Sequence, residues 1–265
     1  MISVVMPNYN GEKFIAQAIE SILNQTYKDF EFIIIDDCST DNSWNIIQEY
    51  ARKDKRIRAY RNEKNLGVSG TLNYGLSHVT GEFIARMDSD DISSKLRFEK
   101  QVKKLEEGFD VVGSDIKIIN SSSKIIGSRV YRDDISNVIV IESPLAHPSV
   151  MFRASLIKDL GVYSSSFKVS QDYDLWLRFY SYGAKFHIIH EPLLRYRVHD
   201  TQVKSTKTKE VIRTVLAIKK NAKKQYRMKF GVRGEIRMVL ERVLLILPSS
   251  FVLWLFYLLR GLRRK

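Results

Sequence analysis

The stretch that decides the fold is Phe83-Ile84-Ala85-Arg86-Met87-Asp88-Ser89-Asp90-Asp91. Its apolar first half is typical of a buried strand, and three carboxylates follow within four residues. Crowded carboxylates repel one another unless a cation neutralises them, and carboxylate oxygens favour hard ions. The stretch therefore predicts a strand that ends in a site for Mg²⁺ or Mn²⁺.

Three further strands precede this one and alternate with helices. Short apolar runs predict strands over 2–6, 30–35 and 57–60. A helical spacing of apolar residues predicts a helix over 13–24. A second helix is expected from Asp41, which can cap it, to about residue 52, and a third after Gly67. This alternation predicts a single α/β domain with a mostly parallel sheet flanked by helices.

Polar clusters follow each of these strands. In open α/β sheets ligands bind beyond the carboxyl ends of the strands, so the clusters are expected to share one edge. Asp36 or Asp37, after the second strand, is expected to accept hydrogen bonds from a base or a ribose, and Tyr9 to stack on a base. Which of the two carboxylates does so stays open.

The middle of the chain is less regular. We expect a helix over 96–107, strands over 111–119, 125–130 and 149–152, and a helix over 171–182 capped by Ser170. The segments 186–189 and 194–198 are expected to be extended.

Five more residues are candidates for chemistry. Asp172 lies in the first turn of the expected helix, where the helix dipole stabilises an ionised carboxylate that can act as a general base. His199 follows an extended run and can add a nitrogen ligand to a metal. His147, Arg195 and Arg197 are weaker candidates for the diphosphate or the acceptor: the arginines can neutralise a departing diphosphate, and the alternative is that they are ordinary exposed strand residues.

In this order the motifs resemble the inverting family 2 glycosyltransferases with the GT-A fold, of the kind that builds bacterial surface polysaccharides. The likeness covers about residues 2–200 and rests on the following segments: Met6-Pro7-Asn8-Tyr9-Asn10, Asp36-Asp37-Cys38-Ser39-Thr40-Asp41, Asn65-Leu66-Gly67, Met87-Asp88-Ser89-Asp90-Asp91 and Gln171-Asp172-Tyr173-Asp174-Leu175-Trp176-Leu177-Arg178.

The resemblance implies a role for each matching position. The nucleotide, usually a uridine diphosphate, would contact Pro7, Tyr9, Asp36, Asp37, Asn65 and Asp88. Asp90 and His199 would hold the metal, and Asp172 would be the catalytic base. Relatives commonly have Glu-Asp where this chain has Gln171-Asp172, so the base falls on Asp172 alone. The Gln-x-x-Arg-Trp signature of processive synthases is missing, which favours transfer of one sugar per encounter.

Charge divides the chain in two. Residues 203–265 carry 17 Lys and Arg against 3 Asp and Glu, a net charge of +14, whereas residues 1–202 carry a net charge of −1. We expect a catalytic domain over 1–202 and a helical tail over 203–265 that associates with an anionic membrane surface. The uncharged run 243–259 is expected to lie in the membrane interface with Trp254 and Phe256; a kinked span or a buried hairpin stays open.

Location and partners follow from these features. One cysteine and no basic region before the first strand suit a cytoplasmic catalytic part, so we expect the cytoplasmic face of the cell membrane. The expected acceptor is a lipid-linked oligosaccharide or another saccharide. Aromatic residues of the tail are not interleaved with its charges, so no nucleic acid is expected. The alternatives are a nucleotidyltransferase that makes the sugar nucleotide and a non-catalytic membrane-binding module.

Overall fold

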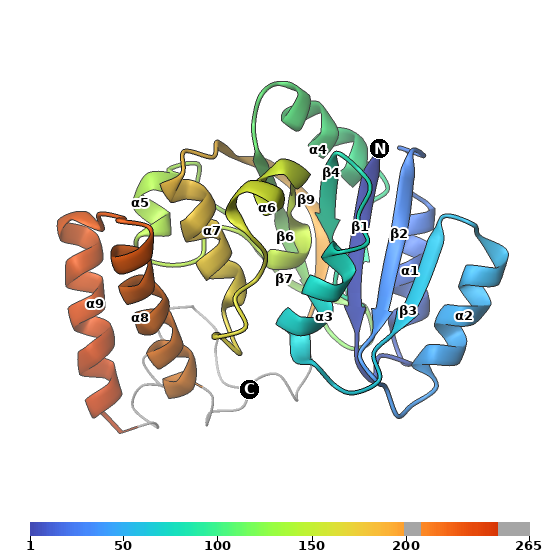
Figure 1. Cartoon of the computed structure of the whole chain (residues 1–265), viewed down its shortest axis with the longest axis horizontal. Coiled ribbons are helices and arrows are strands. Elements are labelled where there is room, and N and C mark those ends of the chain that lie inside the picture. Colours follow the sequence, from blue (N-terminus) through green and yellow to red (C-terminus); the bar gives the residue numbers. More distant parts are fainter. Residues whose placement is uncertain (199–207, 249–265) are drawn as a thin grey trace.

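The computed structural model describes residues 1–198 and 208–248, and its strands form one mixed sheet (Figure 1). The strands are β1 Ile2–Asn8, β2 Phe30–Asp36, β3 Ile57–Arg61, β4 Phe83–Arg86, β5 Ile92–Ser93, β6 Val111–Ile119, β7 Ile125–Arg129, β8 Met151–Arg153 and β9 Phe186–Arg197. Their order across the sheet is β3-β2-β1-β4-β8-β6-β9-β5, with β7 paired to β6.

Helices cover both faces of this sheet. They are α1 Ile15–Leu23, α2 Ser43–Lys53, α3 Gly67–Leu76, α4 Arg97–Glu106, α5 Ile135–Ile139, α6 Ala154–Leu160, α7 Gln171–Ser181, α8 Thr208–Gln225 and α9 Gly231–Ile246, with a short 3-10 turn η1 at His147–Ser149. All seven residues of β2 are buried, which explains its continuous apolar sequence. On α1, Ile15, Ala18, Ile19 and Ile22 form the buried face.

The first four strands are parallel, as their sequence predicts. The register between β1 and β2 places Asn8 beside Asp36, and the register between β2 and β3 places Asp36 beside Arg61. The strand ends that carry the polar clusters therefore meet at one edge of the sheet.

The second half of the sheet differs from the expected mostly parallel pattern. Strand β8 is antiparallel to both β4 and β6, whereas β6 and β9 are parallel. The segments expected as two extended pieces form one strand, β9, whose register against β6 shifts around Asp115. These pairings join segments far apart in the chain, so local sequence patterns do not specify them.

Two expected helix caps differ in detail. Ser170 stands before α7 in the left-handed region, with φ 57°, and its side chain makes no capping hydrogen bond. Helix α2 begins at Ser43, so its N-cap residue is Asn42 and not Asp41. Asp41 lies one residue before the N-cap, and its carboxylate accepts the Ser43 N–H at 3.0 Å.

The last two helices stack at one end of the molecule, where α8 packs on α7 and α9 packs on α8 (Figure 1). The expected domain boundary at 202/203 and most of the uncharged run 243–259 lie outside the described residues. Within 1–198 and 208–248, none of the helices has the length and apolarity to cross a bilayer.

Candidate functional site

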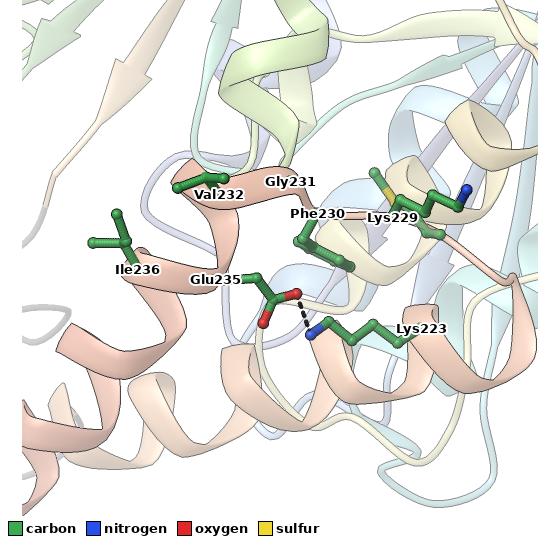
Figure 2. Close-up of a pocket in the computed structure, with 8 residues that line it drawn as sticks. Lys223, Lys229, Phe230, Gly231, Val232, Glu235 and Ile236 are labelled. Atoms are coloured by element: carbon green, nitrogen blue, oxygen red, sulfur yellow. Dashed lines mark ion pairs between the residues drawn. The ribbon is translucent and has the colours of Figure 1, made fainter.

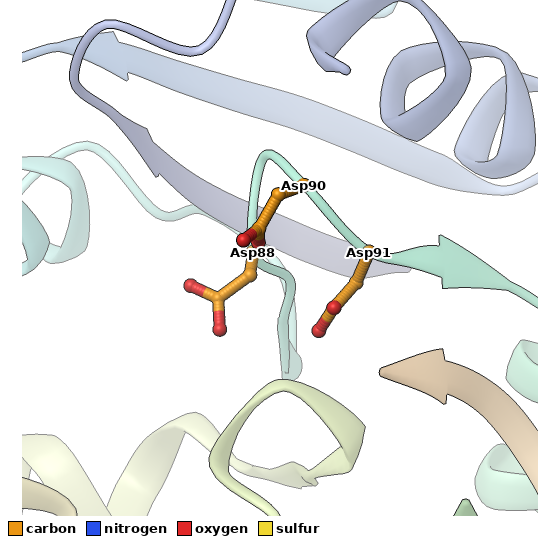
Figure 3. Close-up of side chains that lie close together, drawn as sticks. All are labelled: Asp88, Asp90 and Asp91. Carbon is orange, nitrogen blue, oxygen red and sulfur yellow. The ribbon is translucent and has the colours of Figure 1, made fainter. Parts of the chain in front are cut away.

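The acidic turn 88–91 lies between β4 and β5, at the sheet edge where β1 and β2 also end. Asp88, Asp90 and Asp91 each offer a carboxylate oxygen, and these oxygens lie within 4.8 Å of one another (Figure 3). Three oxygen donors at this separation suit a hard divalent ion, whose remaining positions water or phosphate oxygens can fill.

Asp91 supports the fit of a cation most directly. It is 1% exposed, and its Oδ2 has no hydrogen-bond partner among the described residues. Burial raises the pKa of the Asp91 carboxyl well above its usual range, and the charges of Asp88 and Asp90 add to the rise. A divalent ion would relieve this repulsion, so the residues present fit the expected Mg²⁺ or Mn²⁺.

Arg197 holds the turn in place. Its backbone N–H donates to Asp91 Oδ1 at 2.7 Å, and its Nε donates to the carbonyl oxygen of Asp90 at 2.6 Å. The other guanidinium nitrogens donate to the carbonyl of Asn120 at 3.0 Å and to Gln17 Oε1 at 3.0 Å. These contacts occupy the guanidinium, so the structure does not support the expected contact between Arg197 and a diphosphate.

Arg86 was not among the residues expected in the site. It belongs to β4, is 3% exposed, and its Nη1 lies 2.6 Å from Asp88 Oδ1. Its Nε has no hydrogen-bond partner among the described residues. An arginine within an otherwise apolar strand is the signal that points to it, because a buried cation requires a charged partner.

Asp172 lies in the first turn of α7. The Ser143 hydroxyl is 3.5 Å from its Oδ2. Burial raises the pKa of the Asp172 carboxyl above its usual range, while the backbone N–H of Tyr173 and the charge of Arg86 oppose the rise. Arg86 thus acts electrostatically on the candidate base and pairs with a carboxylate of the acidic turn.

His147 lies in η1, which packs against β4. Its Nε2 is 2.7 Å from the hydroxyl of Tyr163, another residue that sequence reasoning missed. Burial lowers the pKa of the His147 imidazole well below its usual range, and the charge of Arg86 adds to this effect. The imidazole is therefore neutral at pH 7, which fits a hydrogen-bonding role better than the neutralisation of a diphosphate.

The Asp36 carboxylate is hydrogen-bonded within the protein, whereas the sequence predicted that either Asp36 or Asp37 would be available to bind a base or a ribose. It is fully buried; Oδ1 accepts from Ser39 Oγ at 2.5 Å and from Asn8 Nδ2 at 3.0 Å. Its Oδ2 accepts from the Ser39 N–H at 3.0 Å and pairs with Arg61 Nε at 3.2 Å.

Asp37 is also engaged, and its bonds shape the loop 62–67. Its Oδ1 accepts from Asn62 Nδ2 and from the Leu66 N–H, both at 2.8 Å, and its Oδ2 accepts from the Gly67 N–H at 2.9 Å. Gly67 adopts φ 70°, a conformation that favours glycine. Asp37 is therefore tied to the same loop as Asn65, whose Nδ2 donates to the carbonyl of Asp37 at 3.3 Å.

The remaining candidates differ in position. Tyr9 is 52% exposed beyond the end of β1, and Pro7 is partly buried within that strand. Arg195 is exposed on β9 beside Ile92 of β5. His199 lies outside the described residues.

Comparison with known proteins identifies the family. Residues 3–160 match the family described as Glycosyl transferase family 2. This chain belongs to that family. Membership makes it a glycosyltransferase and decides against the alternatives of a nucleotidyltransferase and a non-catalytic module.

A curated relative and two solved structures are similar to this glycosyltransferase. The O-antigen biosynthesis glycosyltransferase WbnJ of Escherichia coli is 37% identical over 208 residues, which are 76% of this chain and 80% of WbnJ. The structure of S. aureus TarS 1-349 with UDP-GlcNAc has a TM-score of 0.66 at 22% identity and covers 82% of this chain and 66% of that one. The mannosyltransferase PcManGT of Pyrobaculum calidifontis, with GDP-Man and Mn²⁺, has a TM-score of 0.64 at 18% identity and covers 95% of this chain and 71% of that one. The two structures confirm the GT-A fold.

Proposed function

We propose that this glycosyltransferase moves one sugar from a UDP-sugar to an acceptor hydroxyl with inversion at the anomeric carbon. The observation that carries the proposal is the acidic turn, where carboxylate oxygens of Asp88, Asp90 and Asp91 lie within 4.8 Å of one another and Asp88 pairs with buried Arg86, whose charge also favours the ionised form of Asp172. One buried cation thus connects a turn suited to a donor diphosphate with a carboxylate suited to an acceptor hydroxyl. In-line displacement requires base and leaving group on opposite sides of the reacting carbon, so the proposal assigns Asp172 to the acceptor side and the acidic turn to the donor side.

Asp172 is the proposed general base. It takes the proton of the acceptor hydroxyl, whose oxygen bonds to the anomeric carbon as the bond from that carbon to the diphosphate oxygen breaks. Burial raises the pKa of its carboxyl, and a more basic carboxylate is a better proton acceptor near neutral pH. Gln171 beside it has no basic side chain, so Asp172 alone supplies this function.

Asp88, Asp90 and Asp91 are the proposed cation site, with His199 as a further candidate ligand. A bound Mn²⁺ or Mg²⁺ would supply Lewis-acid stabilisation of the charge on the departing nucleoside diphosphate. The Mn²⁺ in the PcManGT structure supports a divalent ion, although its donor there is GDP-Man. Exposed Arg195 is a candidate for a contact with the diphosphate.

The nucleotide is proposed to lie over the ends of β1 and β2. Tyr9 is exposed there and can stack on the uracil next to Pro7. Asp36 and Asp37 fix the surrounding backbone, and Asn65 comes from the loop that Asp37 holds. Any contact from either carboxylate to the nucleotide would add to, or replace, these internal bonds. UDP-GlcNAc in the TarS structure supports a uridine nucleotide.

The proposed acceptor is a lipid-linked oligosaccharide at the cytoplasmic face of the cell membrane. The relative WbnJ carries the name of an O-antigen biosynthesis enzyme, which supports a role in surface-polysaccharide assembly. The strongly basic residues 203–265 support peripheral association with anionic lipid.

A product analysis tests this proposal. The purified protein would be given α-configured UDP-sugars, Mn²⁺ and lipid-linked saccharide acceptors, and the new linkage would be assigned by NMR. We expect a β-linked product with the wild type and none with Asp172→Asn. An α-linked product would contradict inversion, and equal turnover by Asp172→Asn would remove Asp172 as the base.

A further inference from the structure

The outward face of α9 carries a row of exposed apolar side chains. The exposed fraction of these side chains ranges from 46% to 84%, and the row consists of Val232, Ile236, Val239, Leu240, Val243 and Ile246. Spacings of one, three and four residues bring them onto one side of a helix. Gly234, Met238 and Glu241 on the opposite side are buried. A surface helix of a soluble protein normally turns its apolar side inward, so this row needs a partner.

A hollow at the turn between α8 and α9 continues this row. Its volume is about 700 Å³, and it is lined mainly by apolar groups of residues 228–236, with Lys223 (Figure 2). Val232 and Ile236 line the hollow and also belong to the row. Lys223 and Glu235 form an ion pair beside Phe230. The row and the hollow together form one apolar surface, which we call the α9 surface.

Positive charge surrounds the α9 surface. At about 100° per residue, Arg233 and Arg242 fall on opposite flanks of the row, and both are exposed. Residues 208–248 carry 11 Lys and Arg against 3 Asp and Glu. A second copy of this chain would bring like charges together. An anionic lipid surface complements both the apolar row and the arginines beside it.

We propose that the α9 surface lies on an anionic lipid bilayer, with its apolar row among the acyl chains and Arg233 and Arg242 at the lipid phosphates. This inference rests on the proposed membrane-bound acceptor and names the surface that meets the membrane. Within the tail 203–265 expected to associate with the membrane, it assigns the contact to one face of α9.

Buried polar contacts connect this surface to the candidate base. Lys219 of α8 pairs with Glu241 of α9 at 2.8 Å, and its Nζ also donates to the carbonyl of Ile141 at 2.9 Å. Ile141 is two residues from Ser143, whose hydroxyl lies beside Asp172. The bilayer contact therefore fixes the orientation of the site as well as its location.

Contacts from α8 to α7 reinforce this link. Asp174 of α7 accepts from the hydroxyl of Tyr226 at 3.0 Å and from Asn221 Nδ2 at 3.3 Å. Asp172 and Asp174 both belong to α7. The helix that carries the candidate base is therefore hydrogen-bonded to α8, which supports the α9 surface.

Sedimentation with vesicles tests the inference on the full chain. The vesicles would be phosphatidylcholine alone or mixed with phosphatidylglycerol. The variant Ile236→Glu with Leu240→Glu adds two negative charges to the row, and Ile236→Gln with Leu240→Gln removes the apolar side chains without charge. The matched control is Ile126→Glu with Val130→Glu, two exposed apolar residues outside α9.

We expect the wild type and the control to bind the phosphatidylglycerol vesicles equally. The Glu variant should bind at least about tenfold more weakly and the Gln variant should fall between them. Binding by the Glu variant equal to that of the control would overturn the inference. A second outcome would also overturn the inference: the wild type is a dimer, and the Glu variant is a monomer that still binds vesicles. The row would then contact a second copy of the chain.

The thermal shift caused by UDP-sugar and Mn²⁺ separates this inference from the proposed function. Both α9 variants should keep the wild-type shift, because these substitutions lie outside the donor site. If the thermal shift is present and vesicle binding does not depend on the apolar row, only the inference about the α9 surface is wrong. If the wild type shows no shift with any nucleotide sugar, the proposed function fails.

Discussion

The Nη1 atom of Arg86 lies 2.6 Å from Oδ1 of Asp88, and both residues stand where β4 runs into the acidic turn. The arginine is buried whereas Asp88 is partly exposed, so the carboxylate reaches outward from a buried cation. Arg86 also acts on the ionisation of His147 and Asp172. A single side chain therefore influences titratable groups on three segments of the site.

Replacing Arg86 is expected to change the pH dependence of the reaction. Burial raises the pKa of Asp172, and Arg86 limits the rise by favouring the ionised form. Arg86→Met should therefore raise that pKa further and move the acidic limb of the kcat/KM profile to higher pH. Activity at pH 7 should fall about tenfold or more, and Arg86→Lys should recover part of the loss.

Arg97→Lys is the matched control for this effect. Arg97 is also fully buried, and it donates to the carbonyl oxygens of Arg86 at 2.8 Å and of Val150 at 3.2 Å. Its replacement should lower thermal stability without moving the acidic limb. An unchanged limb in Arg86→Met would contradict the electrostatic link between Arg86 and Asp172.

Asp172→Asn should block transfer while leaving donor binding intact. An amide cannot accept the hydroxyl proton, so kcat should fall by about 100-fold or more. Isothermal titration with a UDP-sugar and Mn²⁺ should give a dissociation constant within about twofold of the wild type, since Asp172 is assigned to the acceptor side. Loss of donor binding in this variant would assign Asp172 to the nucleotide instead.

Arg197→Met should loosen the acidic turn. It deletes the Nε bond to the Asp90 carbonyl and the bonds to Asn120 and Gln17. Their acceptors are partly buried or exposed, and a typical intramolecular hydrogen bond contributes about 0.5–1.5 kcal/mol, so urea denaturation should show a loss of about 2 kcal/mol. More Mn²⁺ should be needed for half-maximal stabilisation by donor. A variant with full stability and unchanged metal dependence would exclude this positioning role.

Lys219→Met should destabilise the fold. Lys219 is fully buried. Glu241 is 4% exposed and would retain Arg237, at 3.0 Å, as a charged partner. Removal of one partner of a buried ion pair lowers the free energy of unfolding by about 3–5 kcal/mol. We expect a smaller loss here because Arg237 still pairs with Glu241. The double variant Lys219→Met with Glu241→Leu should recover much of the loss, as measured by urea denaturation. A double variant as unstable as the single would contradict this account.

The first half of the fold follows from local sequence patterns. Strands buried on both faces read as continuous apolar runs, and Asp88, Asp90 and Asp91 follow such a run directly. The comparisons confirm the family and the GT-A fold. The antiparallel insertion of β8 between β4 and β6 was not predictable, because its pairing partners lie far away in the chain.

The meeting of the polar clusters at one sheet edge was predictable from the sequence, whereas their individual contacts were not. The roles of Asp36 and Asp37 depend on partners such as Arg61 and the backbone N–H of Leu66, which folding brings to them. Arg197 was expected to face a diphosphate because alternation along a strand does not say which side faces the ligand. Arg86 was missed because its ion pair with Asp88 depends on the shape of the folded turn, which no sequence motif marks.

The most direct test of a donor site at the acidic turn is the thermal shift of wild type and Asp90→Ala with UDP-, GDP-, dTDP- and CMP-sugars, with and without Mn²⁺. Ligand binding raises apparent stability by mass action. The account predicts a shift of the wild type by a UDP-sugar that requires Mn²⁺, and little or no such shift of Asp90→Ala. An equal, Mn²⁺-independent shift of both proteins would contradict it.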